Sequence, residues 1–146
     1  MAYILMAAFS VFLLIANSVD LGRGIQTEKA IQEYNSAQLA SGMIVMANVL
    51  GIYLYKKPIQ DGVVNIEELP LLISPDPRIH HVVKDGRIWV YINSKVPELM
   101  QELHRLSKGS ALICIVENGK LKMLTGENMN LPLPSDLKEG TVVYLN

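Results

Sequence analysis

This sequence contains few of the residues that form disulfides and metal sites. It has one cysteine and three histidines in 146 residues. A single cysteine cannot form a disulfide within the chain or a multi-cysteine metal site, and it leaves the redox compartment open. The net charge of −1 excludes a strongly basic nucleic-acid surface and an acidic solvating tail. Half of the residues are hydrophobic, which excludes intrinsic disorder.

Charged residues are also scarce, at 18% against about 25% in an average protein, and the shortage is concentrated at one end. Residues 1–19 contain no charged side chain, and all 13 basic and 14 acidic residues follow them. A helix of that length extends about 28 Å, which nearly matches the hydrocarbon core of a bilayer. We therefore predict that residues 1–19 form a membrane anchor helix attached to a globular chain of ordinary composition.

Two other interpretations of this first segment remain open. Ala16-Asn17-Ser18 has the small-x-small pattern of a signal-peptide cleavage site, although the usual basic residues before the apolar core are missing. Alternatively, a soluble protein could bury the segment as a core helix inside a partner or an oligomer. Processing of the type IV pilin kind is not expected, because Gly22 and Gly24 follow the apolar run and a pilin leader places its glycine before it.

A second apolar stretch begins at Thr27, and its pattern predicts one long helix. The helix should end before Pro58, because the residue that precedes a proline is disfavoured in the helical region. Gly22-Arg23-Gly24 is expected to be a flexible juncture between the two helices. Apolar residues with three- and four-residue spacing should form a buried face: Leu39, Met43, Met46, Leu50 and Leu54.

Residues 37–55 are also free of charge, so a second membrane span is the alternative to a water-soluble helix packed on a sheet or a partner. Ala47 and Gly51 have the small-xxx-small spacing that lets membrane helices approach closely. Three polar residues, Gln38, Ser41 and Asn48, would each need a partner in lipid, whereas an amphipathic helix can present them to water. We favour the packed helix.

After Pro58 the pattern changes to the alternation typical of strands, and two turn signals predict hairpins. Asp85-Gly86 and Asn118-Gly119 both suit a type I′ turn, whose two central residues need positive φ. Each dipeptide separates two predicted strands, 82–84 from 87–92 and 112–116 from 121–124.

Between the hairpins, the apolar spacing of Val96–Ser107 predicts a helix that Ser94 caps and Gly109 closes. A last strand is expected over Thr141–Leu145. The predicted fold class is therefore α+β, with an N-terminal transmembrane helix, a long second helix, and a small antiparallel sheet of two hairpins plus a C-terminal strand, with one packing helix.

Three regions follow from this layout: a membrane anchor helix over 1–19, a juxtamembrane region and long helix over 20–57, and a compact α+β domain over 58–146. Within the compact domain, Trp89 and Leu103 are expected to pack together.

No group of side chains predicts catalysis, a cofactor site or a metal site. His80 and His81 are neighbours on a strand, so their side chains face opposite sides and cannot both bind one metal in regular geometry. Cys114 lies in an apolar run, where burial tends to raise the pKa of a thiol. Glu67-Glu68 and the like-charged pair Glu98/Glu102 are expected on solvated surfaces. We expect no catalytic residue, no cofactor and no metal ligand.

The layout resembles a known family. An apolar segment over Met1–Asn17, a helix over Ala37–Pro58 that ends in NVLGIYLYKKP, and a small α+β domain are together similar to the PilM-type proteins of type IVb and conjugative thin-pilus systems. This family differs from the larger actin-like cytoplasmic protein of the same name. The resemblance implies a non-enzymatic, single-pass protein of the bacterial inner membrane that takes part in pilus biogenesis and has its C-terminal domain in the periplasm.

The resemblance also implies partners and leaves alternatives. The partners would be the inner membrane and other pilus or secretion assembly proteins, with no nucleic acid, and a homo-oligomer is left open. A minor-pilin-like subunit is one alternative, because the helix ending resembles the first helix of minor pilins. Another is a membrane-tethered binding module, inhibitor or adaptor that recognises a ligand through the 125–140 loop, where Leu131-Pro132-Leu133-Pro134 could adopt the polyproline form.

Overall fold

The computed structural model describes the backbone of residues 2–146 and the side chains of residues 28–146. By its contacts the chain divides into two units, Met1–Asn35 and Ser36–Asn146. The second, compact unit therefore includes the end of the long helix in addition to the predicted 58–146 domain. The predicted membrane anchor, residues 1–19, lies outside the described side chains and stays a prediction.

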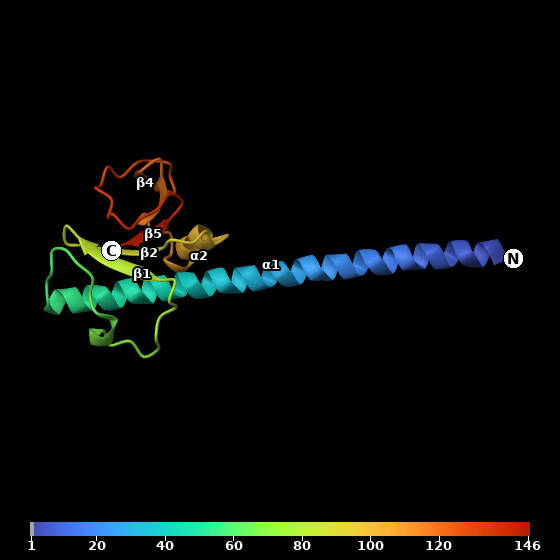
Figure 1. Ribbon diagram of the computed structural model, residues 1–146, viewed down its shortest axis with the longest axis horizontal. Helices are drawn as coiled ribbons and strands as arrows, with labels where there is room; N and C mark the ends of the chain where they lie inside the picture. Colours follow the sequence, from blue (N-terminus) through green and yellow to red (C-terminus); the bar gives the residue numbers. More distant parts are fainter. Residues whose placement is uncertain (1) are drawn as a thin grey trace. The chain divides into compact units, whose positions relative to one another are not determined.

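The first helix, α1, covers Ala2–Lys56 (Figure 1). Its backbone is helical through Gly22-Arg23-Gly24, so the flexible juncture expected there is wrong. A glycine costs a helix about 1 kcal/mol relative to alanine, but it adopts helical angles without steric conflict. The helix ends before Pro58, as predicted, and Lys56 lies in its last turn.

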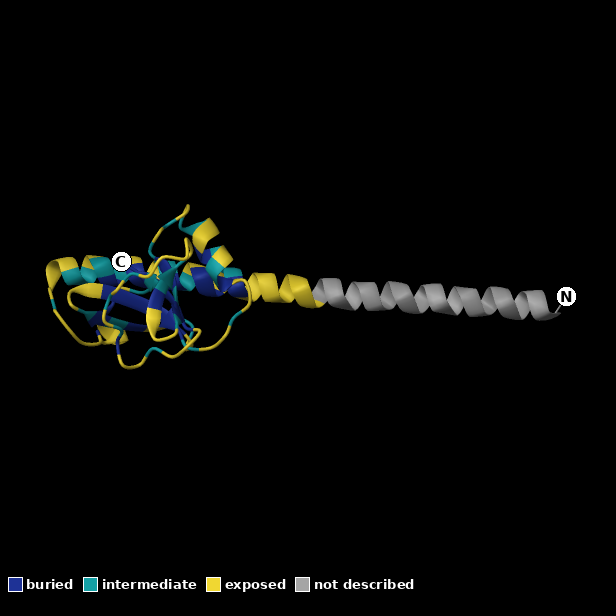
Figure 2. Cartoon of the chain, turned by 90° about the horizontal axis from the view of Figure 1, so that it is seen from above, coloured by how far each residue is buried: buried dark blue, intermediate teal, exposed yellow. Residues whose placement is uncertain are grey.

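In the compact unit, α1 buries one face against the sheet (Figure 2). Leu39, Met43, Met46 and Leu50 are at most 1% exposed, which confirms that residues 37–55 form a packed helix. Among the described side chains, one helical stretch, Glu28–Lys56, is long and apolar enough to cross a membrane by length and composition alone. Some of its apolar side chains are buried in the core, and others, such as Val45 and Ile52, are exposed.

Five antiparallel strands form one sheet, which confirms the α+β fold class. They are β1 (His80–Lys84), β2 (Arg87–Ile92), β3 (Ile113–Glu117), β4 (Lys120–Met123) and β5 (Val142–Leu145). The order is β1-β2-β5-β3-β4, so the C-terminal strand lies between the two hairpins and joins them. Both predicted turns are confirmed, since the central residues have positive φ: 52° and 72° at Asp85-Gly86, and 52° and 67° at Asn118-Gly119.

The sheet separates two apolar clusters, because side chains alternate between its faces along each strand. Val90, Ile92 and Leu103 belong to the cluster that also contains α1. Trp89 belongs to the cluster on the other face, so the predicted packing of Trp89 against Leu103 is wrong. That second face is covered by side chains of the 125–140 loop: Met129, Leu131, Leu133 and Leu137.

The second helix, α2, covers Leu99–Leu106 and is shorter at its start than predicted. The expected cap, Ser94, lies outside α2. Pro97 disfavours helical angles at the residue before it, Val96, so the helix begins only after this proline. Glu98, in the left-handed region at φ 62°, occupies the cap position instead. Gly109, at φ 85°, closes the helix as predicted, and its N–H donates to the carbonyl of His104 at 2.8 Å.

Before the sheet, Gly62 forms an isolated β-bridge with Val83. A 3₁₀ helix, η1 (Ile66–Glu68), follows, and the side chain of Asn65 caps it. Val64 and Leu69 on either side of η1 are buried, so this proline-rich connection is held against the core.

Candidate functional site

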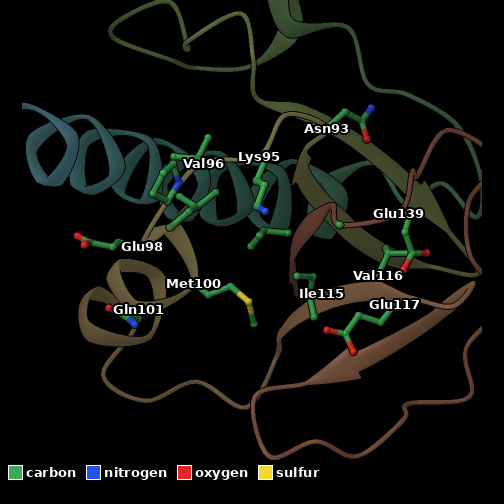
Figure 3. A pocket seen from close by; sticks show the side chains of 14 residues that line it. Asn93, Lys95, Val96, Glu98, Met100, Gln101, Ile115, Val116, Glu117 and Glu139 are labelled. Carbon is green, nitrogen blue, oxygen red and sulfur yellow. The ribbon is translucent and has the colours of Figure 1, made fainter. Parts of the chain in front are cut away.

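A groove of about 670 Å³ opens between the start of α2 and strands β3 and β5 (Figure 3). One side is formed by the segment that leads into α2, from Asn93 to Gln101. The other side is formed by Ile115–Glu117 of β3 and by Glu139, Gly140 and Val142 at the start of β5. The groove exists because α2 begins late, after Pro97, and leaves this part of the sheet uncovered.

The floor of the groove is apolar. Met100 of α2 and Ile115 of β3 point toward each other across it (Figure 3). Both side chains are half-buried, and Val96 adds a third half-buried apolar side chain at the α2 end. A groove whose floor exposes apolar side chains is typical of a binding site for a ligand or a protein segment.

The rim of the groove carries charges, but two of its three carboxylates are already engaged. Glu117 accepts a hydrogen bond from Lys122 Nζ at 2.8 Å. Glu139 accepts from the backbone N–H groups of Asn118 at 2.8 Å and Gly119 at 3.4 Å, which fixes the second hairpin turn. No histidine, cysteine or serine lines the groove in the described part of the chain. An apolar floor with a few polar groups at the rim is typical of a binding groove.

The two neighbouring histidines lie on opposite faces of β1, as predicted. His80 is exposed, and its ring centroid lies 5.6 Å from that of Tyr91. His81 is buried, with Nε2 at 2.9 Å from the carbonyl oxygen of Val64. Burial lowers the pKa of His81, so the neutral ring is favoured. His81 therefore ties β1 to the connection before η1.

Cys114 is buried in the sheet, as predicted, with its Sγ 3.5 Å from Sδ of Met129. Burial raises the pKa of its thiol to about 11. The thiol is therefore protonated at neutral pH and lacks the thiolate character that a nucleophile needs. Across residues 28–146, no three histidine, cysteine, aspartate or glutamate side chains gather closely enough to hold a metal ion.

A polar cluster at the end of α1 was missed at the level of sequence. Tyr53 Oη donates to Glu68 Oε2 at 2.6 Å, and Lys57 Nζ lies 3.6 Å from the same oxygen. These two neighbours, Tyr53 first, lower the pKa of the Glu68 carboxyl. Glu68 is exposed, as expected, but it connects η1 to the YLYKKP ending of α1.

The 125–140 loop, considered above as a binding loop, turns its apolar side chains toward the sheet. Leu131 and Leu133 are half-buried against the cluster that contains Trp89. Lys84 Nζ donates to the carbonyl of Leu133 at 3.0 Å, which holds the loop to β1. Its leucines serve as a cover for the sheet.

Two comparisons with known proteins agree with this architecture. The PilM family matches the chain over residues 11–145. The crystal structure of PilM from Escherichia coli B7A is similar at 28% sequence identity and a TM-score of 0.66, covering 79% of this chain and 94% of that one. No curated protein matches the chain significantly.

Proposed function

The chain belongs to the PilM family, and from this premise we propose that it is a non-enzymatic, membrane-anchored component of the apparatus that assembles a thin type IV pilus. The family match over residues 11–145 carries the proposal, because it includes part of the uncharged N-terminal segment and the whole compact unit up to its last strand. The apolar floor of the groove beside α2 supports a role in binding.

The anchor and the compact unit have separate tasks in this proposal. Residues 1–19, which carry no charge, hold the protein in the inner membrane as a single span. The compact unit, Ser36–Asn146, lies in the periplasm. Residues 37–55 do not add a second span, because their apolar face is used in the core of that unit.

The groove beside α2 is the surface through which the compact unit contacts another assembly protein. Its floor of Met100, Ile115 and Val96 supplies apolar area, which contributes about 25 cal/mol for each Å² that a partner removes from water. Glu117 and Glu139 are held in place by their own hydrogen bonds, so the rim has a fixed shape before the partner arrives.

Deletion of the gene in the native host tests the role. Surface pili counted by electron microscopy should disappear and return when the full chain is supplied. A chain lacking residues 1–19 should not restore them. Pili that persist at normal numbers after deletion would refute the proposal.

The groove is tested with a matched pair of variants on α2. Met100→Asp places a charge on the apolar floor, whereas His104→Asp places the same charge on an exposed position of the same helix that does not line the groove. We expect Met100→Asp to reduce pilus number while His104→Asp does not, with equal amounts of both proteins in the membrane fraction. Equal pilus numbers for the two variants would exclude the groove as the contact surface.

The side of the membrane is tested with a single new cysteine. Glu127 is exposed, so Glu127→Cys should react with a membrane-impermeant thiol reagent in intact spheroplasts. The wild-type chain is the control, because Cys114 is buried. Labelling that appears only after lysis would place the compact unit in the cytoplasm.

A further inference from the structure

The exposed residues in the last part of α1 form a single line. Between Ser36 and Tyr55, every exposed residue belongs to one set: Gln38, Ser41, Val45, Asn48, Ile52 and Tyr55. They are separated alternately by three and four positions, which is the spacing of the a and d positions in a coiled-coil heptad. We call these six residues the α1 strip. The same spacing continues toward the N-terminus in the sequence, at Tyr34 and Ile31, which are also exposed.

The composition of the α1 strip differs from that of an ordinary solvated helix face. Such a face normally carries charged residues, and the strip has none. Its apolar members are open to solvent: Val45 is 48% exposed, Ile52 57% and Tyr55 90%. The opposite face of the helix is already buried in the core. Within the described part of the chain, nothing covers the strip.

A neighbouring loop extends this uncovered apolar surface. Leu72 is fully exposed and Ile73 is 82% exposed. Between this loop and the strip lies a cavity of about 250 Å³, lined on one side by Gln38, Ser41 and Val45. Leu71, Ile73 and Pro75 of the loop line the other side. A helix laid along the strip would therefore also meet the apolar side chains of this loop.

We propose that the α1 strip is the contact surface of a parallel homodimer, in which the same strip of a second copy of this chain packs against it as a two-stranded coiled coil. In an in-register pair, each a or d layer meets its own copy. Asn48 then faces Asn48 and Gln38 faces Gln38, and each amide can both donate and accept. Val45 and Ile52 meet apolar partners. No like charges meet, because the strip carries no charge.

The polar layers favour a second copy over an unrelated helix. A partner with a continuous apolar seam would bury the amides of Gln38 and Asn48 without hydrogen bonds, which disfavours such a partner. The parallel direction rests on the proposed membrane anchor, which inserts both copies in the same orientation. An antiparallel pair that overlaps the whole strip would instead place Asn48 against Val45 and Ser41 against Ile52, each a polar side chain against an apolar one.

Cysteine crosslinking of the full chain in detergent micelles tests the arrangement. Asn48→Cys should give a covalent dimer with a short bis-maleimide, because the two copies of residue 48 face each other. Glu127→Cys, also exposed, should give none, and neither should the wild-type chain, whose Cys114 is buried. A crosslink that forms only between Asn48→Cys and Val45→Cys chains would overturn the parallel arrangement.

A second variant tests whether the strip itself holds the dimer. Ile52→Lys changes an exposed side chain, so the fold should be unaffected, but it places two like charges in one layer. We expect loss of the dimer by light scattering after size exclusion, whereas Glu127→Lys should leave it unchanged. A wild-type chain that remains monomeric, or a dimer that persists in Ile52→Lys, would overturn the proposal. These readouts use purified protein and are independent of pilus number, so failure of the dimer and failure of the pilus role are distinguishable.

Discussion

Leu103 is the position at which the packing of α2 can be measured most directly. Its side chain is fully buried in the cluster shared by α1, α2 and one face of the sheet. Leu103→Ala removes three carbon atoms from that cluster, which costs about 2 to 3 kcal/mol in transfer free energy at about 0.8 kcal/mol for each buried methylene. A cavity that does not collapse raises the total toward the upper end of the observed range of about 2 to 5 kcal/mol.

Trp89 provides the signal for this measurement. It is the single tryptophan of the chain, it is 1% exposed, and it lies on the opposite face of the sheet from Leu103. Its fluorescence therefore reports unfolding of the compact unit without direct contact with the substituted side chain. The free energy of unfolding is obtained from urea titrations of both proteins in the same micelles.

Arg105→Ala is the matched control for this prediction. Arg105 lies on the same helix but is largely exposed, and it pairs with Glu102 at 2.7 Å. Arginine and leucine have similar helix propensities, so the two variants differ mainly in burial. We expect no measurable change for Arg105→Ala. A loss smaller than about 1 kcal/mol for Leu103→Ala would show that α2 does not pack as described.

Three further predictions follow from single residues. Burial lowers the pKa of His81 below its ordinary value of about 6.5, so on acidification the unfolded chain takes up a proton before the folded chain does. The urea concentration at the unfolding midpoint should therefore decrease as the pH is lowered from about 7 to about 5. His81→Gln should reduce this pH dependence, and a midpoint that rises on acidification would contradict the prediction. Gly119→Ala should cost about 1 to 2 kcal/mol from backbone strain alone, because its φ is +67° and nothing lies within 4 Å of the added Cβ; an unchanged urea midpoint would show that the turn relaxes. Cys114, whose pKa burial raises to about 11, should react with a thiol reagent only after unfolding, and rapid labelling of the native chain would show that the sheet opens.

The hairpins could be predicted from the sequence because their determinants are local. Asp85-Gly86 and Asn118-Gly119 each combine a residue that tolerates positive φ with a glycine, and the turn type then sets the register of the flanking strands. Pro58 similarly determined where α1 ends. The turn type and the helix end each depend on a few neighbouring residues, so they could be predicted without knowledge of distant contacts.

The position of Trp89 could not be predicted in the same way. Alternation shows that Trp89 and Val90 face opposite sides of β2, but it does not show which side receives the helices. That choice depends on β5, which enters between β2 and β3, and on the 125–140 loop, which covers the other face. Both β5 and this loop lie far from β2 in the sequence, so local patterns around Trp89 do not reveal them.

The groove was missed for a related reason. Its existence depends on the late start of α2, and Pro97 inside the predicted helix 96–107 was the available signal. A proline is tolerated in the first turn of a helix, so its presence alone did not decide between a helix that begins before it and one that begins after it. In the structure Glu98 adopts a left-handed conformation, and α2 begins one residue later.

The sequence pattern alone did not show whether the uncharged stretch of α1 packs against protein or crosses a membrane. Residues 37–55 carry apolar side chains on two faces, one with Leu39, Met43 and Leu50 and the other with Val45 and Ile52. The first face is buried by the sheet of the same chain. In the proposed dimer the second face is covered by another copy, so a charge would be unfavourable on either side. The same stretch would then need no lipid around it to explain its composition, and the polar residues Gln38, Ser41 and Asn48 would determine the register between the two copies.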